Sequence, residues 1–126
     1  MVLMKIYRCE LCGNVVLKMY DGGDPLSCCG QPMKELVANS KDAALEKHVP
    51  AVTRDGSTLS VQVGDVLHPM TPEHYIAWIL VEQGDKTQFV SLTPDDEPKA
   101  IFTVDPKQPA VVYEYCNLHG LWKKEV

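Results

Sequence analysis

The sequence lacks the marks of two large classes, the nucleic-acid-binding proteins and the membrane-spanning proteins. Its 12 basic residues are outnumbered by 17 acidic ones, which gives a net charge of −5, whereas nucleic-acid binding requires a basic face. The longest apolar run, Tyr75 to Val81, is far shorter than the roughly 20 residues that cross a bilayer. Lys5 and Arg8 stand where a signal peptide would need its apolar stretch. We therefore expect a cytoplasmic protein without nucleic-acid or membrane partners.

The sequence also lacks the even number of cysteines that a disulfide framework needs. It has five cysteines, so any such framework would leave one of them unpaired. A cytoplasmic compartment also keeps thiols reduced. Metal binding or redox chemistry is therefore a better interpretation of these cysteines than disulfide bonding.

The cysteines and histidines are segregated along the chain into two groups. The first group is Cys9, Cys12, Cys28 and Cys29, and the second is His48, His68, His74, Cys116 and His119. A polar stretch, Ala38–Asp42, lies between them. Two ligand sets of different chemistry predict two sites in two domains, residues 1–37 and residues 38–126.

The first segment is too short to be stabilised by a hydrophobic core alone. A unit of under about 40 residues usually needs a metal ion, disulfides or a partner subunit. Strand-like pieces occur at Lys5–Arg8 and Val15–Tyr20. Cys9 and Cys12 are spaced so that two thiolates can reach one metal ion from a single turn, and Gly13 permits a positive φ angle there.

The second cysteine pair is unusual because Cys28 and Cys29 are adjacent. Most zinc ribbons use a second C-x-x-C pair, whereas neighbouring ligands must splay to reach one ion, so we expect a distorted tetrahedron. Four thiolates hold either zinc or iron, and the spacing alone leaves both metals open. A thioredoxin-like role is disfavoured because no βαβ unit surrounds these cysteines.

The rest of the chain has the pattern of an all-β domain. Leu59, Val61 and Val63 alternate with polar residues, which is the period of a half-buried strand. Further β-rich runs are Val49–Arg54, Tyr75–Glu82, Thr87–Leu92, Ala100–Val104, Ala110–Cys116 and Leu121–Lys124. Seven short strands separated by turn signals predict an immunoglobulin-like antiparallel β-sandwich. Only Asp42–Lys47 has a helical pattern.

Each of the four histidines lies at an expected strand end or loop, where the loops at one end of a sandwich could converge. Cys116 and His119 form a chelating pair, with a soft thiolate and an imidazole on one turn. Considered singly, such histidines are usually ordinary surface residues. Together they predict a mixed histidine–cysteine metal site, and zinc, copper and iron are all compatible with imidazole ligands.

Taken together, these residues resemble the desulfoferrodoxins, the superoxide reductases with two iron centres. The motifs are Cys9-Glu10-Leu11-Cys12-Gly13, Cys28-Cys29, Glu46-Lys47-His48-Val49-Pro50, His68-Pro69-Met70, His74-Tyr75-Ile76 and Cys116-Asn117-Leu118-His119-Gly120. Their order and spacing extend over the whole chain. The resemblance implies a desulforedoxin-like first domain whose four cysteines bind one iron ion. It also implies a second domain in which the four histidines surround a second iron ion and Cys116 is its axial ligand.

The function implied by the resemblance is the one-electron reduction of superoxide to hydrogen peroxide at the second iron, which an external donor then re-reduces. The residue matching Glu46 can occupy the sixth iron position in the ferric form, and the residue matching Lys47 brings positive charge near superoxide. A small donor protein such as a rubredoxin and a homodimeric assembly are further expectations. Two alternatives remain open, a non-catalytic rubredoxin-like electron carrier and a zinc-stabilised binding module.

Overall fold

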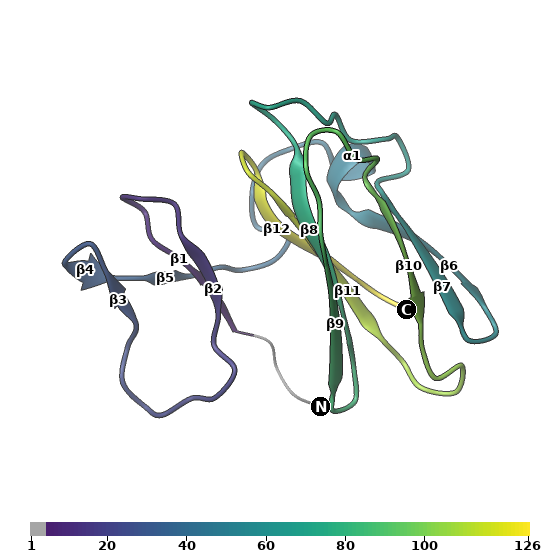
Figure 1. The fold of residues 1–126 in the computed structure, drawn as a ribbon, viewed down its shortest axis with the longest axis horizontal. Helices are drawn as coiled ribbons and strands as arrows, with labels where there is room; N and C mark the ends of the chain where they lie inside the picture. The colour runs from purple at the N-terminus through teal and green to yellow at the C-terminus, as the bar shows by residue number, and fades with distance from the viewer. Residues whose placement is uncertain (1–4) are drawn as a thin grey trace. The chain divides into compact units, whose positions relative to one another are not determined.

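The computed structural model describes residues 5–126 and divides the chain into two compact units, one ending at Val37 and the other extending from Ala38 to Val126. Apart from one short helix, the regular elements of both units are antiparallel strands (Figure 1), which confirms the predicted all-β class. The first four residues of the predicted first domain lie outside the described residues. Within residues 5–126, no helix has the length and apolar character needed to cross a membrane.

The first unit contains one small sheet and one hairpin. Its strands are β1 (Ile6–Arg8), β2 (Val15–Leu17), β3 (Ser27–Cys28), β4 (Gln31–Pro32) and β5 (Lys34–Glu35). The sheet has the order β2-β1-β5, and β3 pairs with β4. Strand β2 ends earlier than predicted because the chain bends at Met19 and Tyr20, and beyond this bend Asp21 pairs with the Lys18 ammonium at 2.8 Å. Among the described residues of this unit, only Ile6 and Cys9 are buried apolar side chains, so its core is very small.

The second unit is a seven-stranded sandwich with one short helix. Its elements are α1 (Leu45–His48), β6 (Pro50–Asp55), β7 (Thr58–Val63), β8 (Ile76–Gln83), β9 (Lys86–Ser91), β10 (Lys99–Thr103), β11 (Val111–Cys116) and β12 (Gly120–Glu125). One sheet has the order β10-β7-β6 and the other β12-β11-β8-β9, with antiparallel pairing throughout. Figure 1 shows the strands of both sheets, and the two antiparallel sheets confirm the predicted immunoglobulin-like sandwich.

The core of the sandwich lies between its two sheets. Leu59, Val61 and Val63 are all buried on β7, as their alternation predicts, and they belong to the same apolar cluster as Ile79 of β8 and Val112 of β11. Strand β11 is buried at every position, because it occupies the middle of the four-stranded sheet. The strand ends that carry the histidines and Cys116 are therefore fixed to a rigid framework.

Helix α1 begins and ends later than the predicted range Asp42–Lys47. Ala44 is still extended, with φ −65° and ψ 112°, so the first helical residue is Leu45. The Ala44 carbonyl then accepts hydrogen bonds from the Lys47 amide at 3.2 Å and from His48 Nδ1 at 2.8 Å. The one-turn helix is thus built around a histidine ring at its last position.

Candidate metal centres

The first cysteine pair lies on a tight turn that follows β1. The Gly13 amide donates to the Cys9 carbonyl at 2.9 Å, and Gly13 has φ +82°, as its place after the C-x-x-C pair predicts. The Cys12 amide lies 3.5 Å from Cys9 Sγ. The turn therefore directs a backbone N–H at the first sulfur, a contact that favours the thiolate.

The second pair lies on the β3–β4 hairpin. Cys28 is the last residue of β3, whereas Cys29 and Gly30 form the two-residue turn, with φ +52° and +75°. Positive φ at both turn positions is typical of the type I′ hairpin turn. This conformation explains how adjacent cysteines serve one site, because one is a strand residue and the other a turn residue.

The four sulfur atoms are close enough to share one metal ion. They lie within 4.8 Å of one another, with Cys12 Sγ 3.6 Å and Cys29 Sγ 3.9 Å from Cys28 Sγ. A tetrahedral ion with metal–sulfur bonds of about 2.3 Å would place its sulfurs about 3.8 Å apart. All five cysteines of the chain are unbridged, so this cluster is a set of free thiols that fits a metal ion.

The pKa values of these thiols are shifted by hydrogen bonds within the cluster. Hydrogen bonding from the Cys12 backbone amide lowers the pKa of Cys9 to about 6. Hydrogen bonding with the other thiols, Cys12 first, raises the pKa of Cys29 to about 12 and also raises the pKa of Cys28. Four thiolates cannot gather here without a cation, which is the condition that a bound metal ion satisfies.

The histidine cluster lies at one end of the sandwich. Its members flank five strands at that end: His48 precedes β6, His68 follows β7, His74 precedes β8, Cys116 ends β11 and His119 precedes β12. Because neighbouring strands are antiparallel, the starts of β6, β8 and β12 lie beside the ends of β7 and β11. The topology therefore brings together residues as far apart as positions 48 and 119.

The four imidazoles form a closed square. The centroid distances around it are 4.7 Å for His48–His68, 4.6 Å for His68–His74, 5.1 Å for His74–His119 and 4.8 Å for His119–His48. The diagonal from His48 to His74 is 6.4 Å. Neighbouring rings are nearly perpendicular, with interplanar angles between 76° and 90°. The rings thus face a common centre.

The ring nitrogens have the spacing of ligands around a metal ion. His48 Nε2 lies 3.2 Å from His68 Nε2 and 3.0 Å from His119 Nδ1. Two nitrogens at right angles on an ion, with bonds of about 2.1 Å, would lie about 3.0 Å apart. His74 Nε2 is buried without any hydrogen-bond partner, so it too is free to bind an ion.

Two backbone carbonyls fix which ring nitrogens face the centre. Nδ1 of His48 bonds the Ala44 carbonyl at 2.8 Å, and Nδ1 of His68 bonds the Pro69 carbonyl at 2.7 Å. A carbonyl only accepts, so each Nδ1 carries the proton and each Nε2 keeps a free lone pair. Burial lowers the pKa values of His48 and His74 and lowers that of His68 to about 4. These rings are therefore neutral, as metal ligands must be.

Cys116 supplies the only sulfur of this cluster. Its Sγ lies within 4.8 Å of the ligand nitrogens of His48, His68 and His74 and 3.8 Å from His119 Nδ1. Its side chain is fully buried, and burial raises the pKa of the thiol, although hydrogen bonds from the His119 and Leu118 backbone amides oppose the shift. The structure thus gathers the predicted ligands into two clusters, four cysteines in the first unit and four histidines with Cys116 in the second.

Two residues that hold this cluster in place were not predicted. Asn117 accepts from the Tyr75 amide at 2.9 Å and donates to the Glu73 carbonyl at 2.9 Å, so it ties the Cys116 loop to the segment that carries His74. Trp122 stacks on His48 with ring centroids 5.0 Å apart and donates to the His119 carbonyl at 3.1 Å. Only the proximity of Asn117 to Cys116 in the sequence could have indicated the first of these roles.

Glu46 and Lys47 lie on α1 with exposed side chains. Behind their backbone, Gly64 packs so closely that a Cβ there would lie 2.7 Å from the Glu46 carbonyl oxygen, so only glycine fits. Burial lowers the pKa of His48, the hydrogen bond to the Ala44 carbonyl opposes this shift, and charge at His119 and Lys47 lowers the pKa further, whereas Glu46 raises it. Burial first, then charge at His119, His48 and Lys47, lowers the pKa of His74. The field of the Lys47 ammonium therefore reaches two of the rings.

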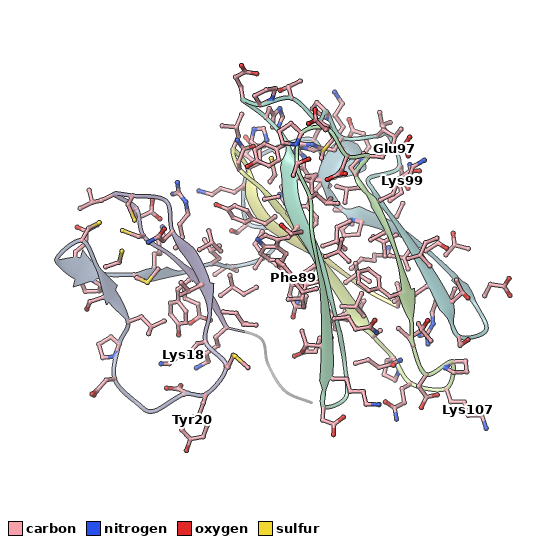
Figure 2. All side chains as sticks on the ribbon, in the orientation of Figure 1. Lys18, Tyr20, Phe89, Glu97, Lys99 and Lys107 are labelled. Carbon is pink, nitrogen blue, oxygen red and sulfur yellow. The ribbon has the colours of Figure 1, made fainter. Side chains whose placement is uncertain are left out.

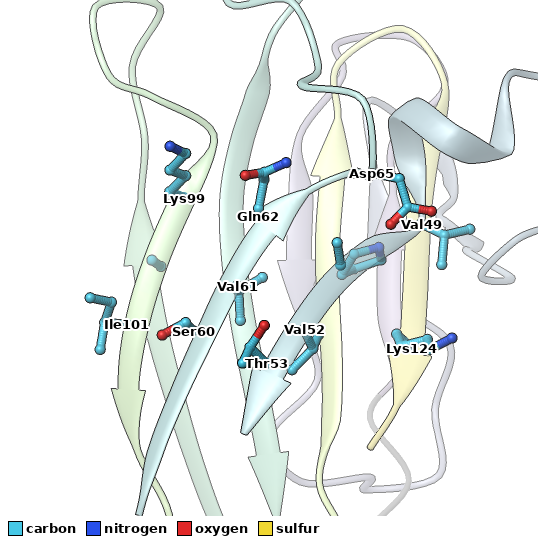
Figure 3. A pocket seen from close by; sticks show the side chains of 13 residues that line it. Val49, Val52, Thr53, Ser60, Val61, Gln62, Asp65, Lys99, Ile101 and Lys124 are labelled. Atoms are coloured by element: carbon cyan, nitrogen blue, oxygen red, sulfur yellow. The ribbon is translucent and has the colours of Figure 1, made fainter. Parts of the chain in front are cut away.

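A separate groove of about 660 Å³ lies on the outer face of the β10-β7-β6 sheet (Figure 3). Its lining includes Ser60, Gln62, Lys99 and Lys124. None of the nine candidate ligands lines this groove. The metal chemistry therefore belongs to the strand ends and loops of the sandwich and not to this groove.

The fold and the two clusters define a protein with two metal centres, an all-thiolate site in a small β unit and a four-imidazole, one-thiolate site in a β-sandwich. The family models described as "Desulfoferrodoxin" and "Desulfoferrodoxin, N-terminal domain" match residues 40–125 and 3–36. The chain belongs to the desulfoferrodoxin family, as its resemblance predicted.

Individual relatives agree with this assignment. The chain is 46% identical over 123 residues to a desulfoferrodoxin of Clostridium acetobutylicum, with 98% of this chain and 97% of the relative covered. The crystal structure of the superoxide reductase from Treponema pallidum is similar with a TM-score of 0.78 and 32% identity over 98% of this chain and 99% of that one. A superoxide reductase (1Fe-SOR) from Giardia intestinalis is similar with a TM-score of 0.59 and 32% identity, over 64% of this chain and 97% of that one.

Proposed function

We propose that this protein is a superoxide reductase that holds two iron ions per chain. The observation that carries the proposal is the square of four imidazoles with the buried Cys116 thiol beside it. Ferrous iron at this centre would supply the single electron that, together with two protons, converts superoxide to hydrogen peroxide. His48, His68, His74, His119 and Cys116 would bind this ion.

The protein environment prepares these ligands for the ion. The carbonyls of Ala44 and Pro69 hold the protons of His48 and His68 on the far side of each ring. Cys116 adds a negative donor that water cannot reach, and thiolate ligation increases the electron density at iron. Such an electron-rich, partly open centre suits electron donation to a small molecule.

We assign the two charged residues of α1 to the handling of superoxide. Lys47 is exposed and its field reaches His48 and His74, so it attracts the anionic substrate. Glu46 precedes it on the same turn, and its carboxylate would be a further donor for the iron ion after superoxide has been reduced. Both assignments are transferred from the matching family positions.

Cys9, Cys12, Cys28 and Cys29 would bind the other iron ion. Two of these cysteines, Cys12 and Cys29, are exposed, so a redox partner could approach this centre closely. We assign the supply of electrons to a small donor protein such as a rubredoxin. We further propose a homodimer, because the first unit has so small a core, and a cytoplasmic location, which suits five unbridged cysteines.

Metal analysis and rapid mixing test the proposal together. Anaerobically purified protein should contain about two iron ions per chain, because there are nine ligands in two separate groups. Stopped-flow mixing of the reduced protein with superoxide should show fast oxidation of the second centre. An electron carrier would contain the same iron but lack this fast reaction. Consistent occupation of the second site by zinc, with no iron, would refute the assignment.

A further inference from the structure

The segment that joins the two sequence domains is attached to the edge of the sandwich by Asn39. Its backbone amide donates to the Leu121 carbonyl at 3.0 Å. Its side chain accepts from the Lys123 amide at 2.9 Å and donates to the Lys123 carbonyl at 3.3 Å. Asn39 has φ +60°, a conformation that asparagine tolerates better than most residues. This segment is therefore held against β12 by three hydrogen bonds.

This attachment positions the side chain of Lys41 against Gly120, the residue that follows the candidate ligand His119. Gly120 comes directly after His119, and a Cβ placed on Gly120 would lie 3.5 Å from Lys41 Cγ and 3.8 Å from Lys41 Cε. The stem of the lysine thus rests on the turn that carries His119. The side chain of Lys41 remains exposed, and within residues 5–126 no carboxylate pairs with its ammonium.

The metal cluster is open on the side where this turn lies. His48 and His68 are 2% and 3% exposed, whereas His74 and His119 are partly exposed. A small anion must therefore approach past the residues around His74 and His119. The chain as a whole carries a charge of −5, which opposes that approach, so each unpaired cation beside the opening increases the local concentration of anions.

We propose that Lys41 is a second steering cation of the active site, held beside His119 by Asn39, and that it attracts superoxide together with Lys47. This inference rests on the proposed superoxide reductase function. Lys41 packs on Gly120, which follows His119 in the chain, whereas Lys47 directly precedes the ligand His48 and is one of the charges that lower the pKa values of His48 and His74. The contribution of Lys41 should therefore be smaller, about 2- to 4-fold in the second-order rate constant.

The kinetic test uses the iron-loaded protein and compares Lys41→Ala with Lys107→Ala, which removes the same charge elsewhere. Lys41→Ala should slow the stopped-flow reaction with superoxide about 2- to 4-fold and weaken its salt dependence, and Lys41→Arg should restore both. The control is Lys107→Ala, which removes the same charge at the end of the sandwich away from α1 (Figure 2). Asn39→Gly keeps the backbone conformation but removes the side-chain bonds, and it should produce part of the Lys41→Ala effect.

A second readout does not depend on turnover. In zinc-loaded protein, the amide protons of Leu118, His119 and Gly120 can be relaxed by a carboxylate-bearing nitroxide and by an uncharged nitroxide. The ratio of the two enhancements reports the local attraction of anions. Lys41→Ala should lower this ratio at these three amides, whereas Lys107→Ala should leave it unchanged.

The outcomes separate this inference from the proposed function. If the wild-type protein does not react rapidly with superoxide, the proposed function fails, although the nitroxide ratios still show whether Lys41 attracts anions to the site. If the wild-type protein reacts rapidly but Lys41→Ala matches Lys107→Ala in rate, salt dependence and nitroxide ratio, the role of Lys41 is refuted.

Discussion

The surroundings of Cys116 show how single residues determine the chemistry of the second centre. Burial alone would keep this thiol protonated, because it raises the pKa, but two backbone amides from its own turn point at the sulfur. A cation placed among the four imidazoles would complete the stabilisation of the thiolate. A cysteine in an apolar core without these amides and without a cation would stay a protonated thiol and would not bind a metal ion.

Replacing the sulfur tests this role directly. Cys116→Ser substitutes a poor ligand for an electron-donating thiolate, so the thiolate-to-iron charge-transfer band of the oxidised second centre should disappear. The fast superoxide reaction should be lost as well, while the absorption of the first centre remains. Iron analysis and stopped-flow spectroscopy measure these effects. A variant that retains four-histidine iron and a near-normal rate would contradict the role given to Cys116.

Lys47 allows a test of electrostatic steering. Because superoxide is an anion and the chain has a net charge of −5, removing a cation near the rings should slow the encounter. We expect Lys47→Ala to lower the second-order rate constant by about 3- to 30-fold, for an ammonium roughly 6 Å from the anion in a partly screened setting. Both iron ions should be retained. The rate of the wild-type protein should fall with added salt, and that of the variant should fall less.

Glu46→Ala provides the contrast to this variant. Its encounter rate should be nearly unchanged, because the carboxylate acts after electron transfer, whereas the later spectrum of the ferric centre should differ. If Lys47→Ala leaves both the rate and its salt dependence unchanged, Lys47 is an ordinary surface charge.

At the scale of elements, the second centre depends on loops that are tied to one another. Asn117 bridges the turn of Cys116 and His119 to the segment of His74 through the Tyr75 amide and the Glu73 carbonyl. We expect Asn117→Ala to lower the metal affinity of the second centre by about 10- to 100-fold, the usual cost of losing a residue that orients metal ligands. Competition with a chelator, followed through the second-centre absorption, measures this affinity.

Asn14→Ala is the reciprocal variant. The Asn14 side-chain amide lies 3.8 Å from Cys28 Sγ, so its removal should disturb the first centre and leave the second unchanged. Equal losses at both centres in either variant would indicate general destabilisation instead of a local role.

The elements also show what could be predicted from the sequence. Strand β7 follows from the alternation of apolar residues and is one residue longer than the predicted Leu59–Val63, and the other sandwich strands follow from β-rich runs between turn signals. The β3–β4 hairpin was not predicted, because two-residue strands leave no periodic pattern and the turn residue Cys29 has a positive φ angle that is uncommon for this residue type. Local sequence patterns therefore predict regular strands well, but they predict poorly the short turns that carry candidate metal ligands.

The same limit applies to the metal centres. All nine candidate ligands were predicted, since cysteine and histidine are conspicuous residue types and their motifs resemble one family. Trp122 and Asn117 were missed because their roles depend on contacts with His48, His119, Glu73 and Tyr75 that only the folded strands create. Side chains that orient ligands carry no spacing signal of their own.

At the scale of the whole molecule, the two centres lie in separate compact units. The division falls between Val37 and Ala38, and every candidate ligand of the second centre lies beyond it. The 1Fe-SOR of Giardia intestinalis is covered over 97% of its length by 64% of this chain, a share much larger than the first unit could supply.

This comparison predicts that residues 38–126 fold and react with superoxide without the first unit. The fragment retains Asn39 and all five ligands of the second centre, and the sandwich has its own continuous core. We expect it to bind one iron ion and to oxidise at a rate within about 3-fold of the full chain, since the four-cysteine centre contributes no ligand to it. The basic and acidic residues of positions 1–37 balance, so the fragment also keeps the net charge of −5 that acts on the anionic substrate. In the full chain, Cys28→Ser should likewise disturb the first iron and spare the second. Metal analysis and stopped-flow mixing with superoxide measure both variants. Loss of the fast reaction in a folded, iron-loaded fragment would show that the first centre is required for the chemistry, and the division of labour proposed here would then be wrong.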